Sequence, residues 1–244
     1  MFRAPTGRSL PFAPGETRRP VGQSRSRTRS ALGRVGYRVR VQRVPIVFAS
    51  LLAASLLAAA AGAARKPVQA TFVGDSVSAS ISHTPTAQAQ LTRGLSVRLD
   101  LEVCRRLVQP SCAYRGSSPT TALQAVQSYG RALGEVLIVM VGHNDSAYGY
   151  AQGIDRVMRA VRSQGVDGVV WVTLRETSSV YHRTNVAIES AAKRWPQLVI
   201  ADWDTYSRDE PWFGRDGLHL TDTGASALAS FLRANVLEVA RSTS

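Results

Sequence analysis

From residue 66 onward, short apolar runs alternate with longer stretches in which apolar residues return every three or four positions. The short runs, such as the continuous stretch EVLIVMVG, are typical of buried β-strands. They predict strands at residues 68–74, 95–103, 135–142, 168–174 and 197–203. The longer stretches have helical periodicity and predict helices at residues 119–133, 153–165, 182–195 and 221–240.

The regular alternation of strand and helix indicates the fold class. Strands joined by helical crossovers form a parallel sheet with helices on both faces. The order therefore predicts a three-layer α/β/α sandwich around a central, mostly parallel five-stranded sheet of the flavodoxin-like type. No internal repeat or second domain is evident in residues 66–244. In such sheets ligands bind beside the carboxyl ends of the strands, so the residues that follow each strand are the candidates for chemistry.

The first part of the chain follows neither pattern. Residues 1–44 contain eleven arginines and one acid, Glu16, with almost no apolar periodicity, which is typical of a disordered tail. This tail holds +10 of the net charge of +13, so only +3 remains for residues 45–244. The basic composition therefore does not indicate nucleic-acid binding by the folded domain. Binding of nucleic acid or anionic lipid by the tail itself stays open.

Residues 45–64 form an uncharged, alanine-rich segment directly after the tail. Its length fits one bilayer crossing, and the small residues at its end also fit a cleavage site near Ala63. The segment is therefore either a cleaved signal peptide or a retained membrane anchor. In both cases the preceding basic residues predict that the chain after residue 65 is exported, as a secreted or cell-envelope domain.

Cys104 and Cys112 are the only cysteines, and both fall in the part expected to be exported. An oxidising compartment favours a disulfide between them, with two buried free thiols as the alternative. The sequence has no Cys-x-x-Cys motif and no cluster of histidines beside these cysteines, so it predicts no metal site.

Chemically useful side chains follow several of the predicted strands. Ser76 ends the sequence GDS after the first strand, Asn144 lies in GHND after the third, and Asp216 and His219 lie in DGLH before the last helix. A serine hydroxyl becomes a nucleophile only beside a base, and histidine is suited to that transfer. A carboxylate that orients the histidine and an amide that stabilises negative charge complete such a site.

These blocks resemble those of the GDSL-type, or SGNH, esterase/lipase family. Gly-Asp-Ser at 74–76 matches its first block, Gly-x-Asn-Asp at 142–145 its third, and Asp-x-x-His at 216–219 its last. They occur in the family's order, within residues 68–240. The resemblance implies an SGNH hydrolase-like fold and a carboxylic ester hydrolase that needs no cofactor or metal. The substrate would be a small-molecule, lipid or glycan ester.

The resemblance also implies a role for each matching residue. Ser76 would be the nucleophile, His219 its general base and later general acid, and Asp216 the group that orients the imidazole. The amide of Asn144 and the backbone N–H of Ser76 would stabilise the oxyanion. Three alternative functions stay open: acyl or acetyl transfer, O-deacetylation that is specific for cell-envelope glycans, and a non-catalytic glycan-binding module.

One block departs from the family pattern. The family places a glycine after the second strand, where its N–H completes the oxyanion hole, but this chain reads EVCRRLVQPSC there. Either the N–H of Cys104 or Arg105 serves there, with the expected disulfide fixing the turn, or that of Gly116 does so from further along the chain, and we favour Arg105. A non-glycine residue at this position must tolerate the dihedral angles of the turn.

Several neighbouring residues have a structural explanation. Asp75 is expected to bond backbone groups around its turn, and His143 either lines the site or is simply packed or solvated. Four aromatic residues precede the Asp-His block, for which we expect core packing, with the lining of an acyl or glycan cleft as the alternative: Trp203, Tyr206, Trp212 and Phe213.

Overall fold

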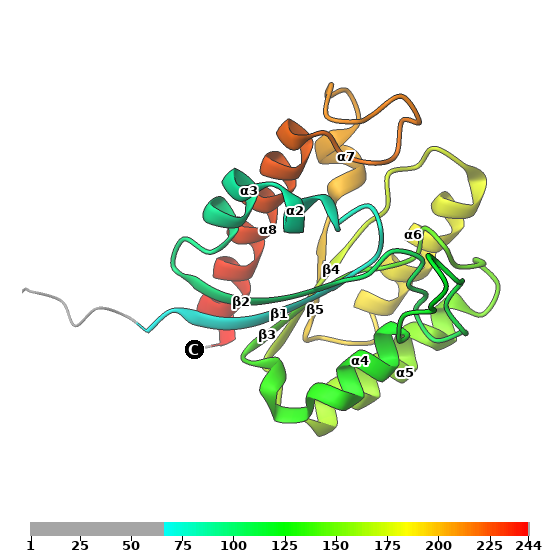
Figure 1. Ribbon diagram of the computed structural model, residues 1–244. Coiled ribbons are helices and arrows are strands. Elements are labelled where there is room, and N and C mark those ends of the chain that lie inside the picture. Colours follow the sequence, from blue (N-terminus) through cyan, green and yellow to red (C-terminus); the bar gives the residue numbers. More distant parts are fainter. Residues whose placement is uncertain (1–65, 244) are drawn as a thin grey trace, which may run out of the picture. The chain divides into compact units, whose positions relative to one another are not determined.

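The computed structural model describes residues 66–243, which form a five-stranded sheet in the order β2-β1-β3-β4-β5 (Figure 1). All neighbouring strands are parallel. The strands are β1 (Val68–Gly74), β2 (Leu95–Leu101), β3 (Val136–Met140), β4 (Gly168–Val172) and β5 (Leu198–Ala201). The predicted three-layer α/β/α fold is confirmed, and its sheet is wholly rather than mostly parallel.

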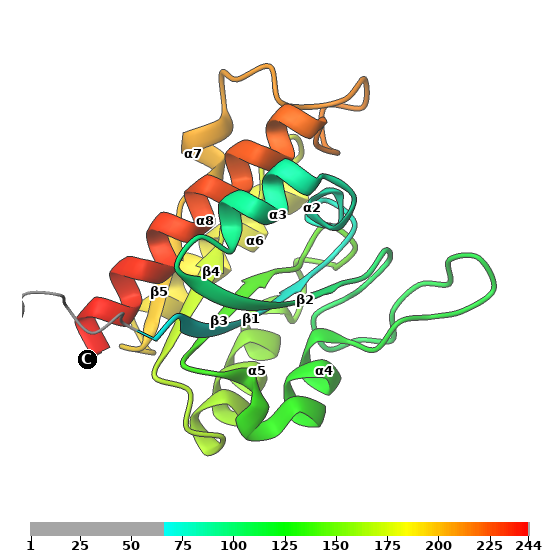
Figure 2. The ribbon, with the colours of Figure 1, turned by 60° about the vertical axis from the view of Figure 1, so that its left-hand side comes forward.

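Helices cover both faces of the sheet (Figures 1 and 2). One face carries α2 (Ser80–His83), α3 (Pro85–Leu91) and α8 (Asp222–Thr243). The other face carries α4 (Ala122–Tyr129), α5 (Tyr150–Ser163) and α6 (Ser179–Ala192). Two short elements complete the chain, the 3-10 helix η2 (Gly130–Leu133) and α7 (Trp203–Ser207).

The strand β3 shows why a continuous apolar run forms a central strand. Val136, Ile138 and Met140 pack into the core beneath α8, whereas Leu137 and Val139 pack into the core beneath α4, α5 and α6. All of them are fully buried. Because successive side chains of a strand point to opposite faces, a strand between two helical layers must be apolar at every position.

Three short helices, α2, α3 and α7, were not predicted. Each has between four and seven residues, which is too short for a helical apolar period to be recognised. The helix α3 begins with Pro85, a residue whose fixed backbone angle suits the first turn of a helix. The predicted longer helices are present with shifted ends.

The ends of β1, β2 and β3 lie together at one edge of the sheet. Gly74 is the register partner of both Leu101 and Met140, so the segments that follow the three strands start side by side. A side chain at position 74 would meet the hydroxyl of Ser78 at 2.0 Å, which explains the glycine there. This arrangement places the residues after each strand in one region.

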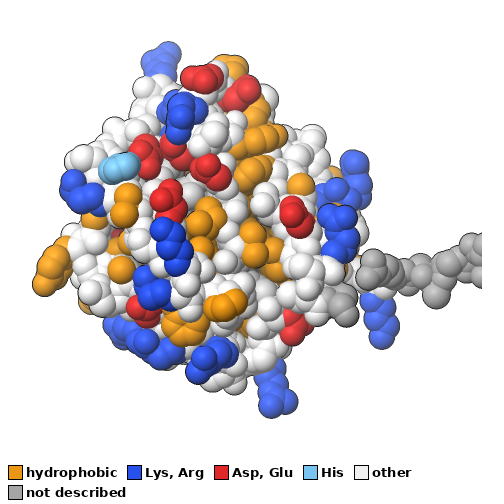
Figure 3. Space-filling view, turned by 180° about the vertical axis from the view of Figure 1, so that it is seen from behind, with side chains coloured by type: hydrophobic (Ala, Val, Ile, Leu, Met, Phe, Trp, Pro, Cys, Tyr) orange, Lys and Arg blue, Asp and Glu red, His pale blue; other side chains and the backbone are white. Residues whose placement is uncertain are grey.

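The predicted tail (1–44) and apolar segment (45–64) lie outside the described residues and stay predictions. Between residues 66 and 243, no helix has both the length and the apolar character of a bilayer crossing. On the face seen in Figure 3, Lys and Arg side chains lie among Asp and Glu side chains.

Candidate active site

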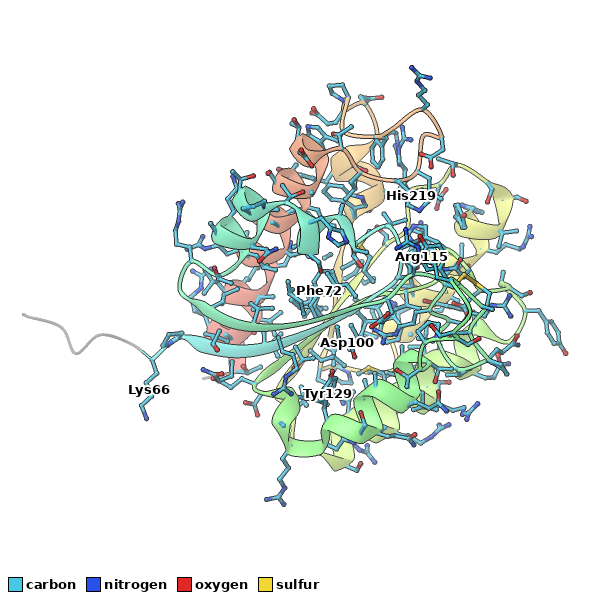
Figure 4. The ribbon with its side chains drawn as sticks, in the orientation of Figure 1. Lys66, Phe72, Asp100, Arg115, Tyr129 and His219 are labelled. Carbon is cyan, nitrogen blue, oxygen red and sulfur yellow. A yellow bond between two sulfur atoms is a disulfide. The ribbon has the colours of Figure 1, made fainter. Side chains whose placement is uncertain are left out.

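Two consecutive hydrogen bonds join Ser76, His219 and Asp216 beyond the carboxyl ends of the strands. The Oγ of Ser76 is 3.1 Å from Nε2 of His219, and Nδ1 of His219 is 2.7 Å from Oδ2 of Asp216. Figure 4 shows His219 in the loop before α8, at the end of the sheet opposite Lys66. Three residues predicted to act together from three sequence positions are therefore within hydrogen-bonding distance.

Asp216 holds the loop and the imidazole at the same time. Its Oδ1 accepts hydrogen bonds from the backbone N–H groups of Leu218 and His219, both at 3.0 Å. The hydrogen bond with the His219 ring and these two N–H groups lower the pKa of Asp216 to about 2. About half of each side chain is exposed, 53% for Asp216 and 50% for His219, so this pair lies at an open surface.

Asp75 joins the segment after β1 to the segment after β3. Its carboxylate is fully buried and accepts hydrogen bonds from the N–H groups of Val77, Gly142 and His143, each at 3.1 Å. The ring Nδ1 of His143 lies 2.9 Å from the same carboxylate. Burial by itself would raise the pKa of Asp75, but the His143 ring and these hydrogen bonds hold it below its ordinary value. The predicted structural role of Asp75 extends well beyond its own turn.

Asn144 and Asp145 form hydrogen bonds with the turn after β2. Nδ2 of Asn144 donates to the carbonyl oxygen of Arg105 at 3.2 Å, and the N–H of Leu107 donates to both oxygens of Asp145 at 3.1 Å. Burial raises the pKa of Asp145 to about 6, although the Leu107 hydrogen bond opposes the shift. The two segments that could supply oxyanion donors are therefore directly connected.

The candidates for the third oxyanion donor differ in their surroundings. The N–H of Arg105 donates to the carbonyl of Glu102 at 3.3 Å, so this favoured donor is already engaged. Gly116 lies at the exposed tip of the loop after β2, between the bridged residues Tyr114 and Ser117. Cys104 has a φ of 70°, in the left-handed region that favours glycine. Cys104 thus has the backbone conformation expected for the missing glycine.

The predicted disulfide between Cys104 and Cys112 is confirmed. The two Cα atoms are 5.1 Å apart, and the N–H of Cys112 donates to the carbonyl of Cys104 at 3.3 Å. The bridge closes a small loop at the start of the longer segment that connects β2 to α4. Neither cysteine is a free thiol.

Arg175, three residues after the end of β4, supports the loop that contains Asp216, and sequence reasoning missed it. Its guanidinium donates to the carbonyl of Gly217 and, at 3.3 Å, to that of Arg208, and it lies 4.0 Å from the centre of the Phe213 ring. Its place at a strand end was the available signal. A lone arginine after a strand, however, is too common to be singled out.

The aromatic residues before the Asp-His block pack together. Trp203 is fully buried and stacks on Trp212 with ring centres 5.7 Å apart, which confirms core packing for Trp203. Tyr206 stacks on Phe231 at 4.7 Å and is 48% exposed. Within the described part of the chain, no group of three or more His, Cys, Asp or Glu side chains is placed to hold a metal ion.

Comparison with solved structures identifies the fold. A proposed arylesterase from Agrobacterium tumefaciens is 16% identical, with a TM-score of 0.56 over 70% of this chain and 99% of that one. A proposed GDSL-like lipase from Bacteroides ovatus is 13% identical, with a TM-score of 0.55 over 72% of this chain and 55% of that one. This is the SGNH/GDSL-type hydrolase fold.

A third protein with the SGNH fold acts on an acetyl group. The C-terminal catalytic domain of peptidoglycan O-acetyltransferase A from Streptococcus pneumoniae is 18% identical, with a TM-score of 0.52 over 72% of this chain and 94% of that domain. No protein-family model and no curated protein matches the sequence. The SGNH fold is therefore recognised from the backbone, and the fold by itself does not specify the activity.

Proposed function

We propose that this chain is a serine hydrolase that cleaves carboxylic esters through Ser76, His219 and Asp216. The observation that carries the proposal is the pair of distances, 3.1 Å from the Ser76 hydroxyl to the imidazole and 2.7 Å from the imidazole to the carboxylate. With a proton on Nδ1 donated to Asp216, Nε2 of His219 is free to accept the serine proton. This is the arrangement that a serine nucleophile requires.

In the proposed reaction, Oγ of Ser76 attacks the ester carbonyl carbon while its proton moves to Nε2 of His219. The imidazolium then gives that proton to the departing alkoxide, so the alcohol leaves and the acyl group stays on Ser76. A water molecule next gives a proton to His219 and attacks the acyl-enzyme. The carboxylic acid departs as the proton returns to Ser76, and Asp216 stabilises the imidazolium in both half-reactions.

We assign the oxyanion hole to the backbone N–H groups of Ser76 and Cys104 and to the amide of Asn144. Among the described residues, neither N–H group donates to another residue. The Asn144 amide uses one of its two hydrogens on the carbonyl of Arg105, which leaves the other for substrate. The engaged N–H of Arg105 and the exposed position of Gly116 favour Cys104 over both. Each donor of this kind lowers the barrier by roughly 3–4 kcal/mol.

The exposure of the site leaves room for an ester with a bulky alcohol part. Because half of the surfaces of His219 and Asp216 faces solvent, groups beyond the scissile bond can extend away from the protein. Small-molecule, lipid and glycan esters all fit this description. Export is part of the proposal, and a disulfide at Cys104 and Cys112 supports it because such bonds persist in oxidising compartments.

Acyl transfer is the second candidate function. A sugar hydroxyl would replace water in the second half-reaction, and the similarity of fold to a peptidoglycan O-acetyltransferase domain favours this candidate. Adding carbohydrate acceptors to an ester assay separates the two. A transferase forms the acylated sugar, whereas a hydrolase releases only the free acid.

The proposal is tested by labelling with a fluorophosphonate probe and by hydrolysis of p-nitrophenyl esters from acetyl to long-chain. We expect the full chain to be labelled and active, and Ser76→Ala to lose both properties while keeping its circular dichroism spectrum. Ser82→Ala, at an exposed serine of α2, is the matched control and should behave as wild type. Activity retained by Ser76→Ala removes the nucleophile assignment. An unlabelled and inactive wild type removes the hydrolase proposal.

A further inference from the structure

The turn after β2 contains a backbone conformation that its residue does not favour. Cys104 has a φ of 70°, an angle that glycine adopts without steric cost but that is unfavourable for a residue with a side chain. Such conformations persist only where the surrounding structure holds them, and they concentrate at functional sites. The contacts that hold Cys104 therefore matter for the proposed active site.

Two sets of contacts hold this turn, one on each side of it. On the sheet side, the buried guanidinium of Arg105 binds the Asp100 carboxylate at 2.7 Å and the carbonyl of Thr120 at 3.0 Å. On the loop side, the disulfide and the hydrogen bond from Cys112 N–H hold Cys104 directly. The hydrogen bond from Arg105 N–H to the carbonyl of Glu102 closes the turn that contains Cys104, and the disulfide is the bond made by the Cys104 side chain itself.

The same turn controls a second donor of the proposed oxyanion hole. The carbonyl of Arg105 accepts the hydrogen bond from Nδ2 of Asn144 at 3.2 Å and so orients that amide. A change of backbone angle at Cys104 would rotate its own N–H and would also shift the next carbonyl. Both donors would then move away from the position of the oxyanion.

The loop beyond the turn is anchored near Leu107, but its tip is exposed. Figure 2 shows the segment between β2 and α4 projecting from the fold, and Figure 4 shows Arg115 of that segment on the same side as His219. Residues 113–118 are exposed. A disulfide that served only to stabilise this loop could lie anywhere along it, but this one ends at Cys104, one of two residues of the segment other than glycine with a positive φ, the other being Arg115 at the exposed tip.

We propose that the Cys104–Cys112 disulfide positions the oxyanion hole, by holding Cys104 in the left-handed conformation that aims its N–H and the Asn144 amide at one oxygen. The inference rests on the proposed ester hydrolase. The disulfide takes the place of the conformational freedom that a glycine would provide. Breaking it lets Cys104 relax to an ordinary conformation, which lowers the rate of the chemical step without removing substrate binding.

Two double variants of the full chain test the proposal. Cys104→Ser with Cys112→Ser removes the bridge and keeps a side chain at position 104. Cys104→Gly with Cys112→Ser removes the same bridge but accepts a positive φ without steric cost. For p-nitrophenyl acetate we expect kcat of the serine variant to fall roughly 10–100-fold with KM little changed, because a displaced donor costs somewhat less than a deleted one. The glycine variant should regain most of the lost kcat.

The outcomes separate this proposal from a purely stabilising disulfide and from failure of the proposed function. If the bridge only stabilises the fold, its loss lowers the melting temperature of both variants but leaves both with wild-type kcat at a temperature where they are folded. That result would overturn the proposal. Equal losses of kcat in both variants would overturn it as well. If the serine variant does not fold, wild type reduced with a phosphine under native conditions gives the comparison, and an unchanged kcat refutes the proposal. An inactive wild type refutes the hydrolase function and this inference together.

Discussion

Asp75 shows how one buried carboxylate can hold a site together. It accepts hydrogen bonds from an N–H group of its own turn and from the N–H of Gly142, which lies 67 residues later in the chain. The carboxylate keeps a lowered pKa despite complete burial because the His143 ring and the hydrogen bonds favour its charged form. Removing it would leave several buried N–H groups without an acceptor. These hydrogen bonds tie the turn that contains Ser76 to the segment that contains Asn144.

Replacing Asp216 by asparagine tests the orienting carboxylate. The variant keeps the size of the side chain but loses the charge that stabilises the imidazolium, so kcat for an ester should fall on the order of 10²–10⁴-fold. Since the pKa of Asp216 is held at about 2, below its ordinary 3.8, the carboxylate is ionised above about pH 4 and loses its charge only as the pH falls through about 2. The loss of kcat should therefore be similar in mildly acidic and neutral buffers.

Steady-state kinetics at two pH values measures this effect. Asp209→Asn, at an exposed acid ahead of the same loop, is the control and should keep wild-type kcat. Full activity of Asp216→Asn would mean that the carboxylate does not assist His219.

The connections after β2 and β3 behave as one unit with the start of α4. The N–H groups of Ala122 and Leu123 donate to the carbonyls of Arg106 and Leu107 at 2.9 and 3.0 Å. The helix α4 begins with a capping box in which Thr121 and Gln124 exchange hydrogen bonds between side chain and backbone. A regular helix end thus anchors the irregular segment, and the segment in turn reaches the site through Asp145.

Asp145 predicts a dependence of stability on pH. Its pKa rises from 3.8 in the unfolded chain to about 6 on folding, so the folded state binds more protons between these values. The contribution of this group to stability is therefore greatest below about pH 4 and is lost as the pH rises through about 6. The loss amounts to at most about 3 kcal/mol.

The contribution of Asp145 to the free energy of unfolding is measured by urea unfolding of wild type and Asp145→Asn at about pH 4.5 and about pH 7. Groups whose pKa is lowered on folding change stability in the opposite direction, but they are common to both proteins and cancel in the difference. Asparagine keeps an oxygen for the N–H of Leu107. We expect wild type to lose more stability than the variant on going to neutral pH. Parallel pH profiles would show that Asp145 ionises normally.

The hydrophobic cores on the two faces of the sheet and the whole candidate site lie within residues 66–243. Ser76 and His219 are 143 residues apart, yet the parallel sheet brings their loops to one edge. Both faces of the sheet are filled by side chains from residues 70–240. Nothing in the proposed chemistry draws on residues 1–65.

Residues 66–244 expressed alone should therefore fold and hydrolyse esters. We expect a cooperative thermal transition, as is usual for a single domain of this size, and kcat within about twofold of the full chain. Circular dichroism and the p-nitrophenyl ester assay measure both. A truncated chain that fails to fold would show that the first 65 residues are part of the structure.

Several features could be predicted from local sequence because they depend on residues close together in the chain. Apolar runs such as EVLIVMVG predict strands, helical periodicity predicts α5 and α8, and the alternation of the two predicts a parallel sheet. The rule that sites gather at strand ends then singled out Ser76, Asn144, Asp216 and His219. The short helices α2, α3 and α7 escaped because they contain too few turns to show a period.

Other features exist only through contacts between distant segments, so local sequence could not reveal them. The left-handed angle of Cys104 occurs in a turn held by the cross-link to Cys112 and by the hydrogen bond from Arg105 to Glu102, and the residues EVCRRLV do not reveal which of them adopts it. The hydrogen bond from Arg175 to the Gly217 carbonyl joins the segment after β4 to a loop more than forty residues later. A strand or helix can be predicted from the periodicity of side chains that are neighbours in the sequence. The direction of an N–H group or a guanidinium is set by whatever packs against it, and that requires the folded chain.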